Sequence, residues 1–165
     1  MTTPKTPARR AAAIAARLGA AAGATALLMA AAPAGQWSTY ANARFGYSIC
    51  YPAAQLTAEP EADNGDGRVF NGADGSSLRV YGSNNARGQT LAKAYAEERA
   101  RHKSISYQRI KGNWYVLSGR DGDELFYIRS LLANGQFKTF ELRYPAAKAA
   151  TWNPLAARIS GCFKG

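Results

Sequence analysis

Apolar residues alternate with small ones in the second half of segment 37–52, and this segment predicts a β-hairpin. Its second strand has apolar, mostly aromatic residues on one face and small residues on the other: Phe45, Tyr47, Ile49 and Tyr51 against Gly46, Ser48 and Cys50. Pro52 ends the strand, because proline has no N–H to donate to a sheet. We therefore expect this hairpin to open the folded domain.

Turn residues divide residues 53–144 into short strands and one helix. The polar segment 53–67 predicts a loop, because it combines Pro60 with two Asn/Asp-Gly signals. Strands are expected at 68–71, 77–83, 104–111, 114–118, 124–133 and 136–144. Between the second and third of these, Thr90 can cap a helix that runs to about His102.

Asn134-Gly135 is the strongest short hairpin signal in the chain, and it predicts that Ala133 pairs with Gln136. This register puts Leu125, Tyr127, Arg129 and Leu131 on the same face as Lys138, Phe140, Leu142 and Tyr144. Phe126, Ile128 and Leu132 lie on the other face with Phe137. Neither face is polar throughout, so both should be covered. The predicted fold class is α/β (α+β), with an antiparallel sheet of about six to eight strands sandwiched between helices.

The tail of the chain predicts a covering helix. Asn153 is expected to cap it, with Pro154 at the first helical position. Cys50 lies on the opposite side of its strand from Tyr47, so we expect the helix to pack on that opposite face and to bring Cys162 to it.

The first 34 residues differ in kind from the rest. Residues 1–17 contain four basic residues and no acidic one, and 18–32 is an unbroken run of apolar and small residues. Ala32-Pro33-Ala34 has the small-x-small pattern of a cleavage site, which predicts a signal peptide over 1–34 and a single domain over 35–165. An uncleaved membrane anchor is the alternative, although the run is shorter than the ~20 strongly apolar residues that a transmembrane helix needs.

Two composition features refine this interpretation. Without the four basic residues of the signal segment, 17 basic residues face 11 acidic ones, a net charge of about +6.

Cys50 and Cys162 are the only cysteines, and in an exported protein such a pair predicts a disulfide. A free nucleophile or a metal pair is the alternative, but neither cysteine has a second cysteine or a histidine at ligand spacing.

The two ends of the domain resemble those of PsbP-like proteins. Segment 40–52, YANARFGYSICYP, resembles the aromatic-Gly-aromatic hairpin ending in Tyr-Pro that begins such domains. Segment 154–164, PLAARISGCFK, resembles their terminal helix, and the order of strands and helices between them also fits. The superfamily includes an extrinsic protein of the oxygen-evolving complex, a Ran-binding import factor and exported bacterial proteins. The resemblance implies a non-catalytic accessory or binding domain, and the paired cysteines depart from its pattern.

Few residues suggest catalysis. His102 is the sole histidine, and beside Arg101 and Lys103 at a helix end we expect it to be exposed. A Cys50–His102 dyad would need a reduced cysteine. The acidic loops Asp63–Gly67 and Asp121–Glu124 lack the alternating ligands of a calcium loop and are expected to be turns. A carboxylate pair for glycoside hydrolysis could come from Glu97, Glu98, Asp121 and Glu141, but no pair is indicated.

Aromatic and basic residues alternate on several predicted strands, as Tyr107 with Arg109 and Tyr127 with Arg129. An exposed sheet with this pattern would suggest nucleic-acid stacking. We favour the alternative that the rings are core and the arginines lie at strand ends, with a glycan or an anionic envelope surface still open as a partner.

The sequence thus predicts a periplasmic or secreted, disulfide-bonded, non-catalytic binding or accessory protein of the bacterial envelope. Its expected partner is an unknown envelope protein or an anionic polymer, with no nucleic acid, no cofactor, no metal, and membrane contact only through the signal segment. The rivals are an envelope hydrolase using carboxylates and a protein–protein interaction module. A carboxylate pair in a cleft would favour the hydrolase, and an exposed apolar patch the interaction module.

Overall fold

The computed structural model describes residues 1–2 and 36–165. Residues 3–35 hold most of the expected signal peptide, its cleavage site and the alternative membrane anchor, so these predictions lie outside the described residues. In the part of the chain that is described, no helix is long and apolar enough to cross a membrane.

The described domain contains nine strands, two α-helices and one short 3₁₀ helix. In chain order these are β1 (Trp37–Asn42), β2 (Tyr47–Pro52), β3 (Thr57–Ala58), β4 (Gly67–Asn71), β5 (Ser77–Asn84), α1 (Leu91–Ala100), β6 (Ser104–Lys111), β7 (Trp114–Asp121), β8 (Glu124–Ala133), β9 (Gln136–Pro145), η1 (Ala146–Lys148) and α2 (Ala149–Cys162). The strands and the first helix lie close to their predicted ranges. The short strand β3 falls in a segment predicted to be a loop.

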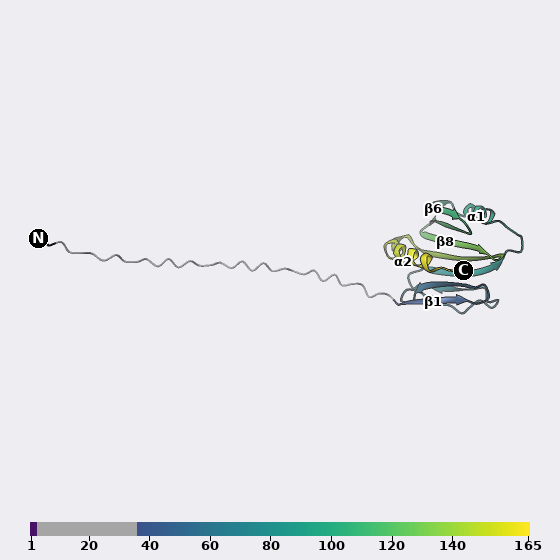
Figure 1. The fold of residues 1–165 in the computed structure, drawn as a ribbon, viewed down its shortest axis with the longest axis horizontal. Coiled ribbons are helices and arrows are strands. Elements are labelled where there is room, and N and C mark those ends of the chain that lie inside the picture. Colours follow the sequence, from purple (N-terminus) through teal and green to yellow (C-terminus); the bar gives the residue numbers. More distant parts are fainter. Residues whose placement is uncertain (3–35) are drawn as a thin grey trace. The chain divides into compact units, whose positions relative to one another are not determined.

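Seven of the strands form one antiparallel sheet in the order β3-β4-β5-β9-β8-β7-β6. The opening hairpin, β1 with β2, forms a separate two-stranded sheet. In Figure 1, β6 and α1 lie at one end of the domain and the hairpin lies at the other. The predicted antiparallel α+β fold is therefore confirmed, with the hairpin as an additional layer.

The two faces of the sheet pack against different elements. On one face, the hairpin and α2 enclose the larger core. That core includes Ile49, Phe70, Leu78, Phe140, Leu142, Trp152, Ile159 and Phe163. On the other face, Leu91 of α1 packs against a smaller core formed by Tyr115, Leu117, Phe126 and Ile128. Both faces of the central strands are covered, as the apolar pattern of β8 and β9 predicts.

The predicted register of β8 and β9 is confirmed. Ala133 pairs with Gln136 across the turn, and Tyr127 pairs with Leu142 on the face of the larger core. Asn134 and Gly135 both have positive φ, 53° and 70°, as the tightest hairpin turns require. The two-residue turn at Asn134-Gly135 is therefore consistent with the register of this central pairing.

Phe45 joins the hairpin to the main sheet. It is 5% exposed and lies so close to Gly82 of β5 that a Cβ at position 82 would be 2.2 Å from its ring. A side chain at this position would push the hairpin off the sheet. Asn42, which is also buried, accepts a hydrogen bond from the backbone N–H of Phe45 at 2.9 Å. This bond fixes the turn that positions the Phe45 ring against β5.

The tail helix starts earlier than predicted. It begins at Ala149 after a 3₁₀ turn, so Asn153 does not cap it and Pro154 lies inside it. Trp152, which is fully buried, donates its indole N–H to Asp74 Oδ2 at 2.9 Å and stacks against Tyr144. This packing holds the turns before Pro154 in a helix despite the backbone hydrogen bond that proline cannot make.

The location predicted for α2 is also wrong. Ile159 and Phe163 share one core with Tyr47 and Ile49, so α2 lies on the apolar side of β2 and not on the opposite face. The chain after α2 runs along the free edge of β2, where Ser48 and Lys164 exchange two backbone hydrogen bonds of 2.9 Å. Because the end of α2 lies at this edge of β2, the helix can pack against the core while Cys162 in its last turn still reaches Cys50.

Asp74 should make the stability of the domain depend on pH. Hydrogen bonds from Ser76 and Trp152 lower the pKa of this carboxyl below its ordinary value of 3.8. Its charge therefore stabilises the fold above pH 3.8, and this contribution is lost as the pH falls through the lowered pKa. Asp74→Asn should be less stable than the wild type at pH 7, with the difference closing in acid.

Urea unfolding at pH 7 and in steps below pH 4 measures this difference. Asp63→Asn, which removes a charge from an exposed loop, is the matched control. A difference between wild type and Asp74→Asn that stays constant with pH would show that the charge of Asp74 plays no part.

Candidate functional site

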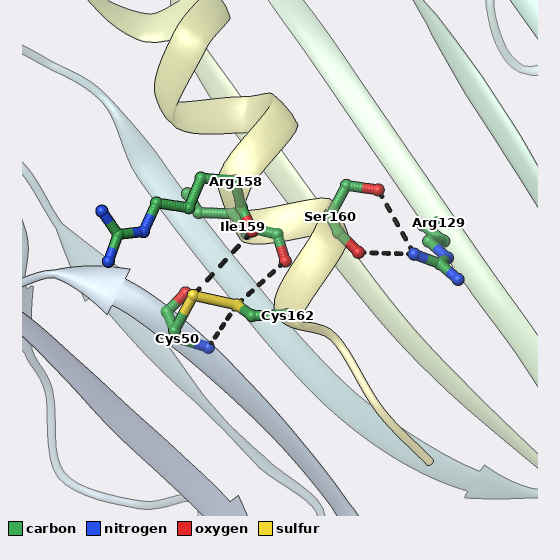
Figure 2. Close-up of a disulfide and its surroundings, with 6 residues drawn as sticks. All are labelled: Cys50, Arg129, Arg158, Ile159, Ser160 and Cys162. Carbon is green, nitrogen blue, oxygen red and sulfur yellow. Dashed lines mark hydrogen bonds between the residues drawn. A yellow bond between two sulfur atoms is a disulfide. The ribbon is translucent and has the colours of Figure 1, made fainter.

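The structure joins Cys50 and Cys162, the pair predicted to form a disulfide. The two Cα atoms are 5.9 Å apart, and the backbone N–H of Cys50 is directed at Cys162 Sγ at 2.9 Å. Figure 2 shows the bond between the edge of β2 and the last turn of α2. Within the described residues no cysteine is free. Such a bond fits an oxidising compartment.

Arg129 of β8 stabilises the end of α2, the helix that carries Cys162. Its Nη1 donates to the carbonyl oxygen and to the hydroxyl of Ser160, as Figure 2 shows. Ser160 lies in the last turn, where carbonyl groups lack partners within the helix and the helix dipole favours a cation. The expectation that arginines lie at strand ends is wrong here, because Arg129 sits in the middle of β8 and is half-buried.

His102 is not the exposed residue that the sequence predicts. Its side chain is 4% exposed, and its ring stacks on Phe126 with centroids 4.0 Å apart. Nδ1 lies 2.9 Å from Asp121 Oδ2, and Nε2 lies 3.3 Å from Glu98 Oε1. The prediction failed because Asp121, on β7, is distant in sequence and covers the ring.

Three of the four carboxylates considered for hydrolysis converge on His102 and Arg143. Glu98 and Asp121 meet at His102, while Asp121 and Glu141 meet at Arg143, which also lies 3.6 Å from Glu124. Burial alone would lower the pKa of Arg143, but its hydrogen bond to Glu141 and the nearby acidic charges raise that pKa above its ordinary value. These carboxylates are therefore ion-paired.

Glu97, the fourth carboxylate, is separate and accepts both of its hydrogen bonds from Gln89 Nε2. The two acidic loops behave as turns. Asn64 Oδ1 accepts the N–H of Asp66 at 3.1 Å, and Gly122 has a φ of 60°. Within residues 36–165 no group of three His, Cys, Asp or Glu side chains is placed to hold a metal ion.

A groove lies at the β4 side of the sheet, and we call it the edge groove. It has a volume of about 650 Å³, within the range of ligand pockets. Its lining includes Pro60, Ala62, Val69, Val80, Tyr81 and Arg79. The guanidinium of Arg79 lies 4.5 Å from the centre of the Tyr81 ring. This groove is not predictable from the sequence, since it forms where loop 59–66 folds back on β4.

Comparisons with known proteins identify the fold. No protein-family model matches the chain, and no curated protein matches it. Among solved structures, the solution structure of cyanobacterial PsbP (CyanoP) from Synechocystis superimposes with a TM-score of 0.59. The match covers 79% of this chain and 92% of that one. The domain has the PsbP-like fold.

The PsbP-like fold was expected from the opening hairpin and the terminal segment, and this prediction is confirmed. Identity to the cyanobacterial protein is only 15%, so the likeness concerns the fold alone. Any function of this PsbP-like domain must be argued from its own residues.

Proposed function

We propose that this chain is an exported binding or accessory protein of the bacterial envelope that holds its partner in the edge groove. The groove itself carries the proposal. It is open, and apolar side chains provide most of its surface. The tyrosine and arginine side chains in its lining can orient a ligand. The disulfide supports a periplasmic or secreted location, and so does the expected signal segment.

The state of the acidic residues favours binding over hydrolysis. A hydrolase of the envelope would need one carboxylic acid and one carboxylate facing a common substrate cleft. Here Asp121 and Glu141 share Arg143, and Glu98 divides its oxygens between Arg101 and His102. None of these three acidic residues lines the edge groove. Two other carboxylates do, and each accepts a hydrogen bond from an asparagine amide: Glu59 from Asn71 and Asp66 from Asn64.

Photo-crosslinking in intact cells tests the proposal. A photoreactive amino acid replaces half-buried Val69 in the edge groove, and the matched control carries it at exposed Ala96 on α1. We expect a defined adduct from position 69 and not from position 96, on a protein that fractionates outside the cytosol with Gly35 as its amino terminus. A second change, Arg79→Glu, should weaken the adduct.

Two results would contradict the proposal. Equal labelling from both positions would show that the groove has no specific occupant. Hydrolysis of envelope polymers that is lost in His102→Ala but kept in Arg79→Glu would assign the function to the ion-paired carboxylates instead.

A further inference from the structure

The strands β6 to β9 separate their charges between the two faces of the sheet. The pairing register places all their acidic residues on the face covered by α1: Asp121, Glu124 and Glu141. The charged residues of the opposite face are all cations: Arg109, Lys111, Arg120, Arg129 and Lys138. One further cation, Arg143, lies among the acidic residues and pairs with them. Such separation gives one face of this half of the sheet a positive potential.

Part of this positive face is open, and we call it the basic face: Tyr107, Arg109, Lys111, Trp114 and Arg129. The first three come from β6, the last strand of the sheet, and all three are exposed. Tyr107 is 48% exposed, which is unusual for a large ring. The Trp114 ring lies 5.9 Å from the guanidinium carbon of Arg109 and 5.3 Å from that of Arg129.

Not every cation of the face can bind a ligand. Arg129 is committed to the end of α2, and Lys138 is buried and donates to the carbonyl of Gly46. Arg109 and Lys111 differ, because they are exposed and neither forms an ion pair within the described residues. These two cations therefore remain available to an anion from outside.

A trough leads from the basic face toward α2. It has a volume of about 390 Å³ and is lined by Ser118, Tyr127, Tyr144, Asn153, Ala156 and Ala157, among others. In the register, Tyr107, Ser118 and Tyr127 form one row across the strands, directly beside the row of Arg109, Val116 and Arg129. The trough therefore adjoins the basic face, and together they present hydroxyl, amide, aromatic and cationic groups.

We infer that this surface binds an acidic polysaccharide, with sugar carboxylates at Arg109 and Lys111 and a sugar ring against Tyr107. Guanidinium and ammonium groups match carboxylates in charge, and guanidinium also matches their planar geometry. In the trough, Tyr127 donates to Ser160 and Tyr144 donates to Asn153. The Ser118 hydroxyl and the N–H groups of the Asn153 amide suit the hydroxyl groups of a sugar chain. The disulfide favours a glycan over a nucleic acid, because it fits a compartment outside the cytosol. The edge groove is a different site, so this inference does not depend on the function proposed for it.

Binding of the purified, oxidised protein to polygalacturonate tests the inference. Dextran serves as the neutral glycan, polyglutamate as a polyanion without sugar rings, and single-stranded DNA as a phosphate polymer. We expect preferential binding to polygalacturonate that weakens with salt. Charge reversal of the exposed pair, Arg109→Glu with Lys111→Glu, should reduce affinity by about tenfold or more, and Tyr107→Ala should reduce it without changing the charge.

The matched control is Lys93→Glu with Lys148→Glu, which makes the same change in net charge away from the basic face. It should bind like the wild type, and thermal unfolding establishes that each variant is folded. Four results would overturn the inference: no binding to polygalacturonate, an equal loss in the control pair, equal binding to polyglutamate, or preference for DNA. The first two results would show that the basic face does not bind glycans, and the last two would show that it binds another class of polymer.

Discussion

Replacing both Cys50 and Cys162 by serine should lower the free energy of unfolding by about 3 to 5 kcal/mol. The bond closes a loop of 112 residues between the opening hairpin and the last turn of α2. Without it, the unfolded chain gains much conformational freedom, whereas the folded chain keeps its hydrogen bonds at the edge of β2. Urea unfolding of the oxidised wild type and of the double variant measures the difference.

Reduced wild type provides the matched control for this experiment. Dithiothreitol should bring the wild type to the stability of the double variant and leave the double variant unchanged. Equal urea midpoints for oxidised and reduced wild type would show that the disulfide does not stabilise the domain.

Trp152→Ala should destabilise the domain by about 3 to 5 kcal/mol, as truncation of a buried aromatic residue does. Its side chain is fully buried, stacks on Tyr144 and donates to Asp74. It also holds the helical turns that precede Pro154, so we expect additional loss of helix from α2. Thermal unfolding followed by circular dichroism measures both effects.

Two further variants separate the causes. Trp152→Phe keeps an aromatic ring but loses the indole N–H, so it should lower the free energy of unfolding by a smaller amount, about 1 to 2 kcal/mol. Thr151→Ala, at an exposed neighbour in the same helix, should have little effect. If Trp152→Ala were as stable as Thr151→Ala, α2 would not be anchored through this residue.

Local sequence signals predict much of the fold because they act between near neighbours. Asn134-Gly135 sets the register of β8 and β9, and Thr90 caps α1 by accepting the N–H of Lys93 at 3.2 Å. Pro154 misleads for the opposite reason. Its preference for the first turn is a local effect, and the burial of Trp152 against distant residues outweighs it.

The candidate sites depend on contacts between distant segments, and the sequence could not place them. His102 is predicted to be exposed because its chain neighbours are charged, yet Phe126 and Asp121 cover it. The edge groove depends on how a loop folds over β4. The alternation of Tyr107 with Arg109 was visible in sequence, but only the strand order shows that β6 is an open edge.

The pairing of Ser48 with Lys164 bears on when the chain can fold. Lys164 leaves the ribosome, or crosses a membrane, after residues 36–163 have already done so. The free edge of β2 and the disulfide can therefore be completed only once these last residues have emerged. Until then the N-terminal hairpin lacks one of its partners, so the domain can complete its fold only when all of residues 36–165 are available to it.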